Sequence, residues 1–311
     1  MENATPAKEN AKKNGKRKNQ LPVAFAYFLT LLICLVAFGF LGYYVLDRFV
    51  FKEEGSSMKP VDLSVPTAED RFSTLYVQVD DFNEMKSALL VRIIPDKCQV
   101  RIVPVSSGLM SAAYAEDAKT TVGEIYAQSG VTGVKKAVEN AYGVPVDKYM
   151  TVTNSSFDSV VDYIGGITYT PTEDMFYFDE KNGDEISCRK GEKIALNHNL
   201  LRVYINYPRF SGGQSQNVKI MSDVMTKFIN EAFMQVDMLS NNMDTIFNVI
   251  YNSSDTDMTR NEYIRYKKGI LYILENETSP CESITPVGTW TGDKFEPGES
   301  FSDELKKFFG I

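Results

Sequence analysis

The stretch from residue 142 to residue 171 constrains the fold of this 311-residue chain more than any other. Apolar residues recur in it at the helical spacing i, i+3, i+4 and i+7: Phe157, Val160, Val161 and Ile164. Ser155 is the expected N-cap of this helix, and the glycine pair at 165–166 ends it. Residues 148–153 and 167–170 have the β-branched and aromatic content of strands. The stretch therefore predicts a βαβ unit in a sheet that is covered by helices.

The first 46 residues have the pattern of a membrane anchor. Residues 1–20 carry six basic and two acidic side chains, a net charge of +4. Residues 21–46 carry no formal charge, and as a helix they would span about 39 Å, more than the roughly 30 Å core of a bilayer. A secretory signal peptide would have a shorter apolar run of about 7–15 residues. Under the positive-inside rule we expect a single-pass cell-membrane protein with a cytoplasmic N-terminus and an extracellular main domain.

The remaining boundaries follow from composition. Residues 47–70 are charged and rich in Ser and Pro, which is typical of a short stalk. Residues 71–311 contain no second linker, so we expect one extracytoplasmic α/β domain there, with three α/β/α layers and a mixed sheet. The net charge of −8 includes the +4 of the tail, so the rest of the chain carries −12. Such an acidic body predicts no nucleic-acid partner.

Hydrophobic periodicity predicts the other elements of this domain. We expect strands at residues 74–79, 87–94, 99–105 and 202–206, the second and third joined as an antiparallel hairpin. We expect helices at residues 132–142, 216–236, 259–275 and 300–309. Thr259 and Glu262 form a capping box at the start of the third of these helices.

The sequence lacks the common catalytic motifs. His198 is the single histidine, which excludes multi-histidine metal sites, and we expect it to be structural or solvated. Neither a glycine-rich phosphate loop nor a G-x-S-x-G turn is present. Cys34 falls in the expected membrane span, and Cys98, Cys188 and Cys281 have no metal-binding spacing. Unpaired thiols are favoured over a disulfide among these last three.

A basic tail, one N-terminal span and an external α/β domain together resemble the LytR-CpsA-Psr family of bacterial envelope proteins. The match is clearest at residues 133–149 and 157–167, and it extends in order over about residues 72–309. The resemblance implies transfer of a glycopolymer, such as wall teichoic acid or capsular polysaccharide, from a polyprenyl-pyrophosphate carrier to peptidoglycan. It also implies arginines that bind the pyrophosphate and Mg²⁺ held by carboxylates.

The sequence departs from the family pattern at the phosphate-binding positions. After the third strand the family has Pro-Arg-Asp, and this chain has VSSG at 105–108. Before the second strand the family has Arg-Ser-Asp-Ser, and this chain has EMKS at 84–87. The arginine-rich strand reads YINYPR at 204–209, and the arginine pair of the next helix reads QNVK at 216–219.

Of the site residues that the resemblance implies, the sequence keeps Asp81 or its neighbour Asp80, Arg209 and Lys219, and Arg101 and Arg202 are further nearby cations. The expected catalytic residues are Asp81 and Arg209. The expected phosphate contacts are Arg101, Arg202 and Lys219, and the expected Mg²⁺ ligands are Asp80 and Asp81. Because losing one preorganised donor costs about 10²–10³ in rate, these departures predict slow transfer.

Three interpretations stay open. In the first, which we favour, the chain is a catalytically attenuated family member that binds a polyprenyl-phosphate lipid, a cell-wall glycopolymer or an envelope partner, and it needs no cofactor. In the second, it is an active Mg²⁺-dependent phosphotransferase with a rearranged site, which moves a glycopolymer from polyprenyl pyrophosphate to peptidoglycan. In the third, the external domain is a scaffold without a ligand.

Overall fold

The structure is a computed structural model of the chain, and it describes residues 65–114 and 118–311. The predicted basic tail, the predicted membrane helix at 21–46 and most of the predicted stalk lie outside these residues. Within the described ranges, no helix is long and apolar enough to cross a bilayer.

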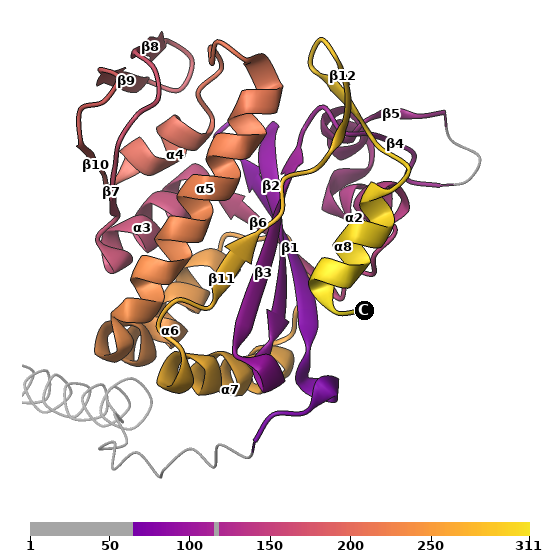
Figure 1. Cartoon of the computed structure of the whole chain (residues 1–311), viewed down its shortest axis with the longest axis vertical. Helices are drawn as coiled ribbons and strands as arrows, with labels where there is room; N and C mark the ends of the chain where they lie inside the picture. The colour runs from indigo at the N-terminus through magenta and orange to yellow at the C-terminus, as the bar shows by residue number, and fades with distance from the viewer. Residues whose placement is uncertain (1–64, 115–117) are drawn as a thin grey trace, which may run out of the picture. The chain divides into compact units, whose positions relative to one another are not determined.

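A five-stranded mixed sheet forms the centre of the described domain (Figure 1), with the strand order β11-β3-β2-β1-β6. The strands β1 (Phe72–Val79), β2 (Met85–Ile94) and β3 (Gln99–Ser106) form an antiparallel meander, which confirms the predicted hairpin. The strands β6 (Lys148–Thr153) and β11 (Cys281–Ser283) lie parallel to β1 and β3 at the two edges.

Helices cover both faces of this sheet because its strands are apolar on both sides. Neighbouring residues of β2 such as Leu89 and Leu90 belong to different cores. One face carries α3 (Asn154–Ile164), α4 (Asn199–Ile205), α5 (Gly213–Met234), α6 (Val236–Tyr251) and α7 (Arg260–Asn276). The other face carries α2 (Val122–Tyr142) and α8 (Phe301–Phe309), and Figure 1 shows the sheet between the two groups. The mixed three-layer α/β/α arrangement is as predicted.

Short elements complete the domain. Two 3₁₀ turns, η1 (Ala68–Asp70) and η2 (Pro95–Lys97), lie before β1 and between β2 and β3. Four two-stranded pairs lie outside the main sheet: β4 (Met110–Ser111) with β5 (Thr120–Thr121), β7 (Ile167–Tyr169) with β10 (Ile194–Leu196), β8 (Met175–Asp179) with β9 (Asp184–Cys188), and β12 (Gly288–Thr291) with β13 (Lys294–Pro297).

The predicted βαβ unit is correct in its elements but wrong in its pairing. Strand β7 leaves the main sheet and pairs antiparallel with β10, so β6 and β7 are not parallel neighbours. The N-cap of α3 is Thr153 rather than Ser155, because the Thr153 hydroxyl accepts the N–H of Ser156 at 3.2 Å. The predicted C-terminus is confirmed, since Gly165 is the C-cap with φ of 91°.

Other elements also differ from the prediction, among them helix α6, which was not predicted. Residues 202–205, predicted as a strand, belong to helix α4, in which Leu201, Tyr204 and Ile205 recur at i, i+3 and i+4 and are buried. Helix α2 begins at Val122, with a capping box formed by Thr121 and Glu124, and is interrupted at Gly130, whose φ of 61° and ψ of −165° are not helical. The predicted helix at 132–142 is the segment after this break, and the segment before it was not predicted.

Candidate functional site

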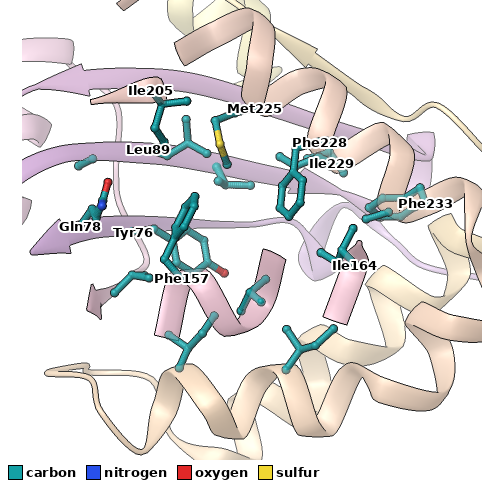
Figure 2. Close-up of a pocket in the computed structure, with 18 of the residues that line it drawn as sticks. Tyr76, Gln78, Leu89, Phe157, Ile164, Ile205, Met225, Phe228, Ile229 and Phe233 are labelled. Carbon is teal, nitrogen blue, oxygen red and sulfur yellow. The ribbon is translucent and has the colours of Figure 1, made fainter. Parts of the chain in front are cut away.

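An apolar cavity of about 310 Å³ lies between the sheet and helices α3, α5 and α6 (Figure 2). Tyr76 and Leu89 line it from the sheet, Phe157 from α3, and Met225 and Phe228 from α5. Small-molecule sites in proteins have volumes of about 300–1,000 Å³, and cavities with such linings stay dry and take apolar ligands. The cavity can therefore hold part of a hydrocarbon chain.

Because of the helical period, the lining side chains of each helix lie on one face and point into the same cavity. On α5 the lining residues recur every three or four positions: Met221, Met225, Phe228, Ile229, Ala232 and Phe233. The stripe predicted on α3 does the same with Phe157, Val160 and Ile164. Burial raises the pKa of Tyr76 to about 12, so its hydroxyl stays neutral beside the cavity.

A polar pocket of about 330 Å³ adjoins the apolar cavity, and Gln78 lines both. The pocket lies between the β1–β2 turn, the β8–β9 hairpin, α4 and the start of α5. Its charged lining residues are Asp80, Lys86, Asp179, Asp184 and Arg202. An amphiphile could place its apolar tail in the cavity and its polar head in the pocket.

Gln78 sits at the junction with half of its amide unpaired. Its Oε1 accepts a hydrogen bond from Asn206 Nδ2 at 2.7 Å and one from the Ser87 hydroxyl at 3.2 Å. Its Nε2 is buried and has no partner in the described part of the chain, and the residue is 6% exposed. A buried N–H group without an acceptor costs about 1–3 kcal/mol, so a ligand oxygen at the junction would be stabilising.

Asp80 and Lys86 form an ion pair across the β1–β2 turn. Asp80 Oδ1 accepts the backbone N–H groups of Phe82 and Glu84, at 3.0 and 2.9 Å. Lys86 Nζ lies 2.8 Å from Asp80 Oδ2, and the Asp80 side chain is 1% exposed. Burial by itself would raise the pKa of Asp80, but the bonds from Lys86 and the backbone hold it below its usual value. Asp80 Oδ1 is therefore bonded to the backbone, whereas Oδ2 is buried without a hydrogen-bond partner in the described ranges and faces the Lys86 ammonium.

Arg202 is also fully engaged. Its guanidinium binds Asp158 at 2.9 and 3.0 Å and Asp184 at 2.6 and 3.0 Å. Burial would lower the pKa of Arg202, but the two carboxylates raise it. Burial likewise raises the pKa of Asp158, against the effect of Arg202. Two carboxylates around one guanidinium leave no positive excess for a ligand.

The residues in this pocket do not fit a magnesium ion. Mg²⁺ requires near-octahedral oxygen ligands at about 2.0–2.1 Å. Asp80 Oδ1 accepts two backbone N–H groups, and Oδ2, which has no hydrogen-bond partner in the described ranges, has the Lys86 ammonium 2.8 Å away, where a metal ion would meet a like charge. Both oxygens of Asp184 accept hydrogen bonds from Arg202. No group of three or more His, Cys, Asp or Glu side chains in the described ranges is placed to hold a metal ion.

The structure brings two of the predicted site residues, Asp80 and Arg202, to the polar pocket. Asp81, Arg209 and Lys219 are exposed and line neither the apolar cavity nor the polar pocket. Arg209 lies over the ring of Tyr177, 5.0 Å from its centroid. Their predicted roles stay predictions.

Arg101 lies on the opposite side of β3 from the apolar cavity. It pairs with Glu282, and its guanidinium lies 4.9 Å from the ring centroid of Phe308. His198 is exposed and pairs with Asp162, and Cys98, Cys188 and Cys281 are free thiols. Neither His198 nor these cysteines line the polar pocket.

The sequence pattern does not single out four residues that line the polar pocket: Gln78, Lys86, Asn206 and Asp184. A single local signal was available: in the EMKS segment, Lys86 stands where the family pattern has an aspartate. The partners of the other three come from distant parts of the chain, such as Asn206 with Gln78.

The layered fold and the adjoining apolar and polar spaces define an α/β domain in which a hydrocarbon-lined cavity opens beside a charged pocket. Residues 75–292 match the LytR_cpsA_psr family, and the chain belongs to this family. The polyisoprenyl-teichoic acid–peptidoglycan teichoic acid transferase TagU of Bacillus licheniformis is 25% identical over 259 residues, which cover 78% of this chain and 80% of TagU.

Solved structures share the fold, and two of them serve as examples. One, from Eubacterium siraeum, is described as a transcription regulator; it has a TM-score of 0.69 and 22% identity, and the match covers 79% of this chain and 94% of that one. The other is Bacillus subtilis TagV, with a TM-score of 0.61 and 18% identity over 78% of this chain and 98% of TagV. The sequence resemblance to this family is thereby confirmed.

Proposed function

We propose that this chain is a membrane-anchored, extracytoplasmic protein of cell-envelope biogenesis that binds a polyprenyl-phosphate-linked glycopolymer and transfers it slowly or not at all. The observation that carries the proposal is the junction at Gln78, where an apolar cavity of about 310 Å³ meets a polar pocket. The prenyl tail would lie in the cavity and the phosphate in the pocket. The glycan would then extend into solvent.

The similar protein TagU supports the class of ligand, since its name specifies polyisoprenyl-linked teichoic acid and peptidoglycan. The uncharged stretch at 21–46 supports the anchor, because a membrane-held domain meets its lipid at the bilayer surface. The state of the pocket cations supports attenuation. Arg202 and Lys86 are bound by carboxylates of the chain itself, so they are poorly placed to neutralise the prenyl monophosphate that leaves when the P–O–P bond of the pyrophosphate breaks.

The binding part is tested by the lipids that accompany the protein. We expect polyprenyl phosphates in the mass spectrum of lipids extracted from the full-length protein, purified in mild detergent. Ala232→Phe should deplete them because it fills the cavity, whereas Ala232→Ser keeps the space and should retain them. Absence of polyprenyl lipid from the wild type, or equal amounts in both variants, would overturn the proposal.

The attenuation is tested by a transfer assay. Full-length protein is incubated with a lipid-linked glycopolymer, peptidoglycan and Mg²⁺, beside TagU of Bacillus licheniformis. We expect a rate lower by at least about 10²-fold, the effect of losing one preorganised donor. A rate equal to that of TagU would instead establish an active transferase with a rearranged site.

A further inference from the structure

The β1–β2 turn is built around a carboxylate that already has a cation. Asp80 closes the turn through two backbone N–H groups, and its own N–H donates to the carbonyl of Glu84 at 3.0 Å. Lys86 follows on β2 and places Nζ 2.8 Å from Asp80 Oδ2. A metal ion that bound this carboxylate would have to displace that ammonium.

Lys86 keeps donor capacity toward the pocket. An ammonium has three N–H donors, and here Lys86 pairs with Asp80 Oδ2 at 2.8 Å and donates one hydrogen bond to Glu84 Oε2 at 3.4 Å. The Lys86 side chain is 32% exposed and lines the polar pocket. Gln78 adds a buried amide N–H₂ that has no partner within the described residues. Two different elements thus offer donors for the oxygens of one anionic group.

The charge of the pocket limits how much negative charge the bound anionic group can carry. Three lining carboxylates, Asp80, Asp179 and Asp184, face two cations, Lys86 and Arg202. A pyrophosphate brings more negative charge than a monophosphate and normally requires a divalent cation or several free arginines. Neither is provided by this pocket, where Arg202 is held by Asp158 and Asp184.

We infer that Lys86 takes the place of a metal ion beside Asp80, and that the polar pocket, with Gln78, binds the phosphate of a prenyl monophosphate without a divalent cation. This inference rests on the proposed function and specifies its head group. The inferred site thus differs from one that binds a prenyl pyrophosphate through a metal ion.

The test measures binding by the full-length protein in detergent micelles. The probes are geranylgeranyl monophosphate, geranylgeranyl pyrophosphate, geranylgeraniol and inorganic phosphate, each titrated calorimetrically in EDTA and in Mg²⁺. We expect the monophosphate to bind equally in both buffers, and at least about tenfold more tightly than the pyrophosphate in EDTA or than either fragment. Two results would overturn the inference and leave the proposed function intact. One is monophosphate binding that is tenfold tighter in Mg²⁺ than in EDTA, and the other is a pyrophosphate affinity in EDTA equal to that of the monophosphate.

Variants of Lys86 test whether its ammonium group binds the monophosphate. Lys86→Met should lower monophosphate affinity about tenfold and leave geranylgeraniol affinity unchanged. Because Lys86→Met leaves Asp80 buried and unpaired, the double variant Asp80→Asn with Lys86→Met serves as a second, charge-free version with the same expected loss. Lys227→Met is the matched control on the exposed face of α5, where Lys227 pairs with Glu231, and it should bind like the wild type. Binding of none of the prenyl probes would overturn the proposed function and this inference with it.

Discussion

Arg202 donates two hydrogen bonds to Asp184, of 2.6 and 3.0 Å, and so ties helix α4 to strand β9. The same guanidinium binds Asp158 of α3. It is a cross-link between three elements that enclose the polar pocket, with a side chain that is 8% exposed. Its first effect is therefore on the stability of the pocket wall.

Arg202→Met should destabilise the protein strongly, because it leaves Asp158 and Asp184 near one another without their cation. We expect a loss of about 3 kcal/mol, the lower end for a broken buried ion pair, since the two carboxylates keep some exposure. Urea unfolding followed by circular dichroism measures it. The matched control Arg209→Met removes an exposed guanidinium that lies over Tyr177, and should cost less than about 1 kcal/mol. Equal losses in the two variants would refute the cross-link.

Elements with strong local signals were predictable. The capping box of α7, with Thr259 and Glu262, and the glycine that ends α3 work through neighbouring backbone groups, and both are confirmed. Helix α6 also had a readable period, in Leu239, Met243 and Phe247, but its many polar residues hid it.

Pairing and packing decided the rest. Val203, Tyr204 and Ile205 have strand propensity, yet they form a helix because that places Tyr204 and Ile205 in the core beside α3 and α5. Strand β7 is just three residues long, and its partner β10 lies far along the chain, so no local pattern specifies the pair. The meeting of Gln78 with Asn206 likewise depends on the finished fold.

Because of the capping box of α7, the free energy of unfolding should fall at low pH. Glu262 accepts hydrogen bonds from Lys148 and from the backbone and hydroxyl of Thr259, which lowers its pKa to about 2. Its unfolded pKa is about 4.3, so the stabilisation is complete above that pH and is lost as the pH falls toward about 2.

Glu262→Gln should therefore be less stable than the wild type near neutral pH, and the difference should shrink below a pH of about 4. Urea unfolding at several pH values measures this difference. Glu275→Gln is the control, because Glu275 is exposed near the other end of the same helix. A difference that stays constant down to a pH of about 3 would contradict the assignment.

The three described cysteines should differ in reactivity. Burial raises the pKa of Cys281 to about 12, and its side chain lies in the core with the residue 3% exposed. Cys98 is half-buried at the end of η2. Because the thiolate is the nucleophile, we expect iodoacetamide to modify native Cys98 at least about tenfold faster than Cys281. Peptide mass spectrometry resolves each site, and urea-unfolded protein, in which the two should react alike, is the control.

The tip of the β8–β9 hairpin should act as a salt-sensitive cover of the polar pocket. Lys181 Nζ lies 2.9 Å from Glu84 Oε2 and 4.2 Å from the ring centroid of Phe82, so the tip is held to the β1–β2 turn. Asp179 and Asn182 of the same hairpin line the pocket. Since exposed ion pairs contribute little to global stability, Lys181→Met should loosen the tip without unfolding the domain.

Hydrogen–deuterium exchange measures this loosening. In Lys181→Met, amides of residues 176–187 should exchange faster, with an unchanged urea midpoint. In the wild type, raising the salt from about 0.1 M to about 1 M should have a similar effect, because the screening length falls from about 10 Å to about 3 Å. Lys190→Met is the control, since within the described residues its side chain makes no ion pair. Unchanged exchange in Lys181→Met, or an equal increase in Lys190→Met, would show that the Lys181 contacts do not hold the cover closed.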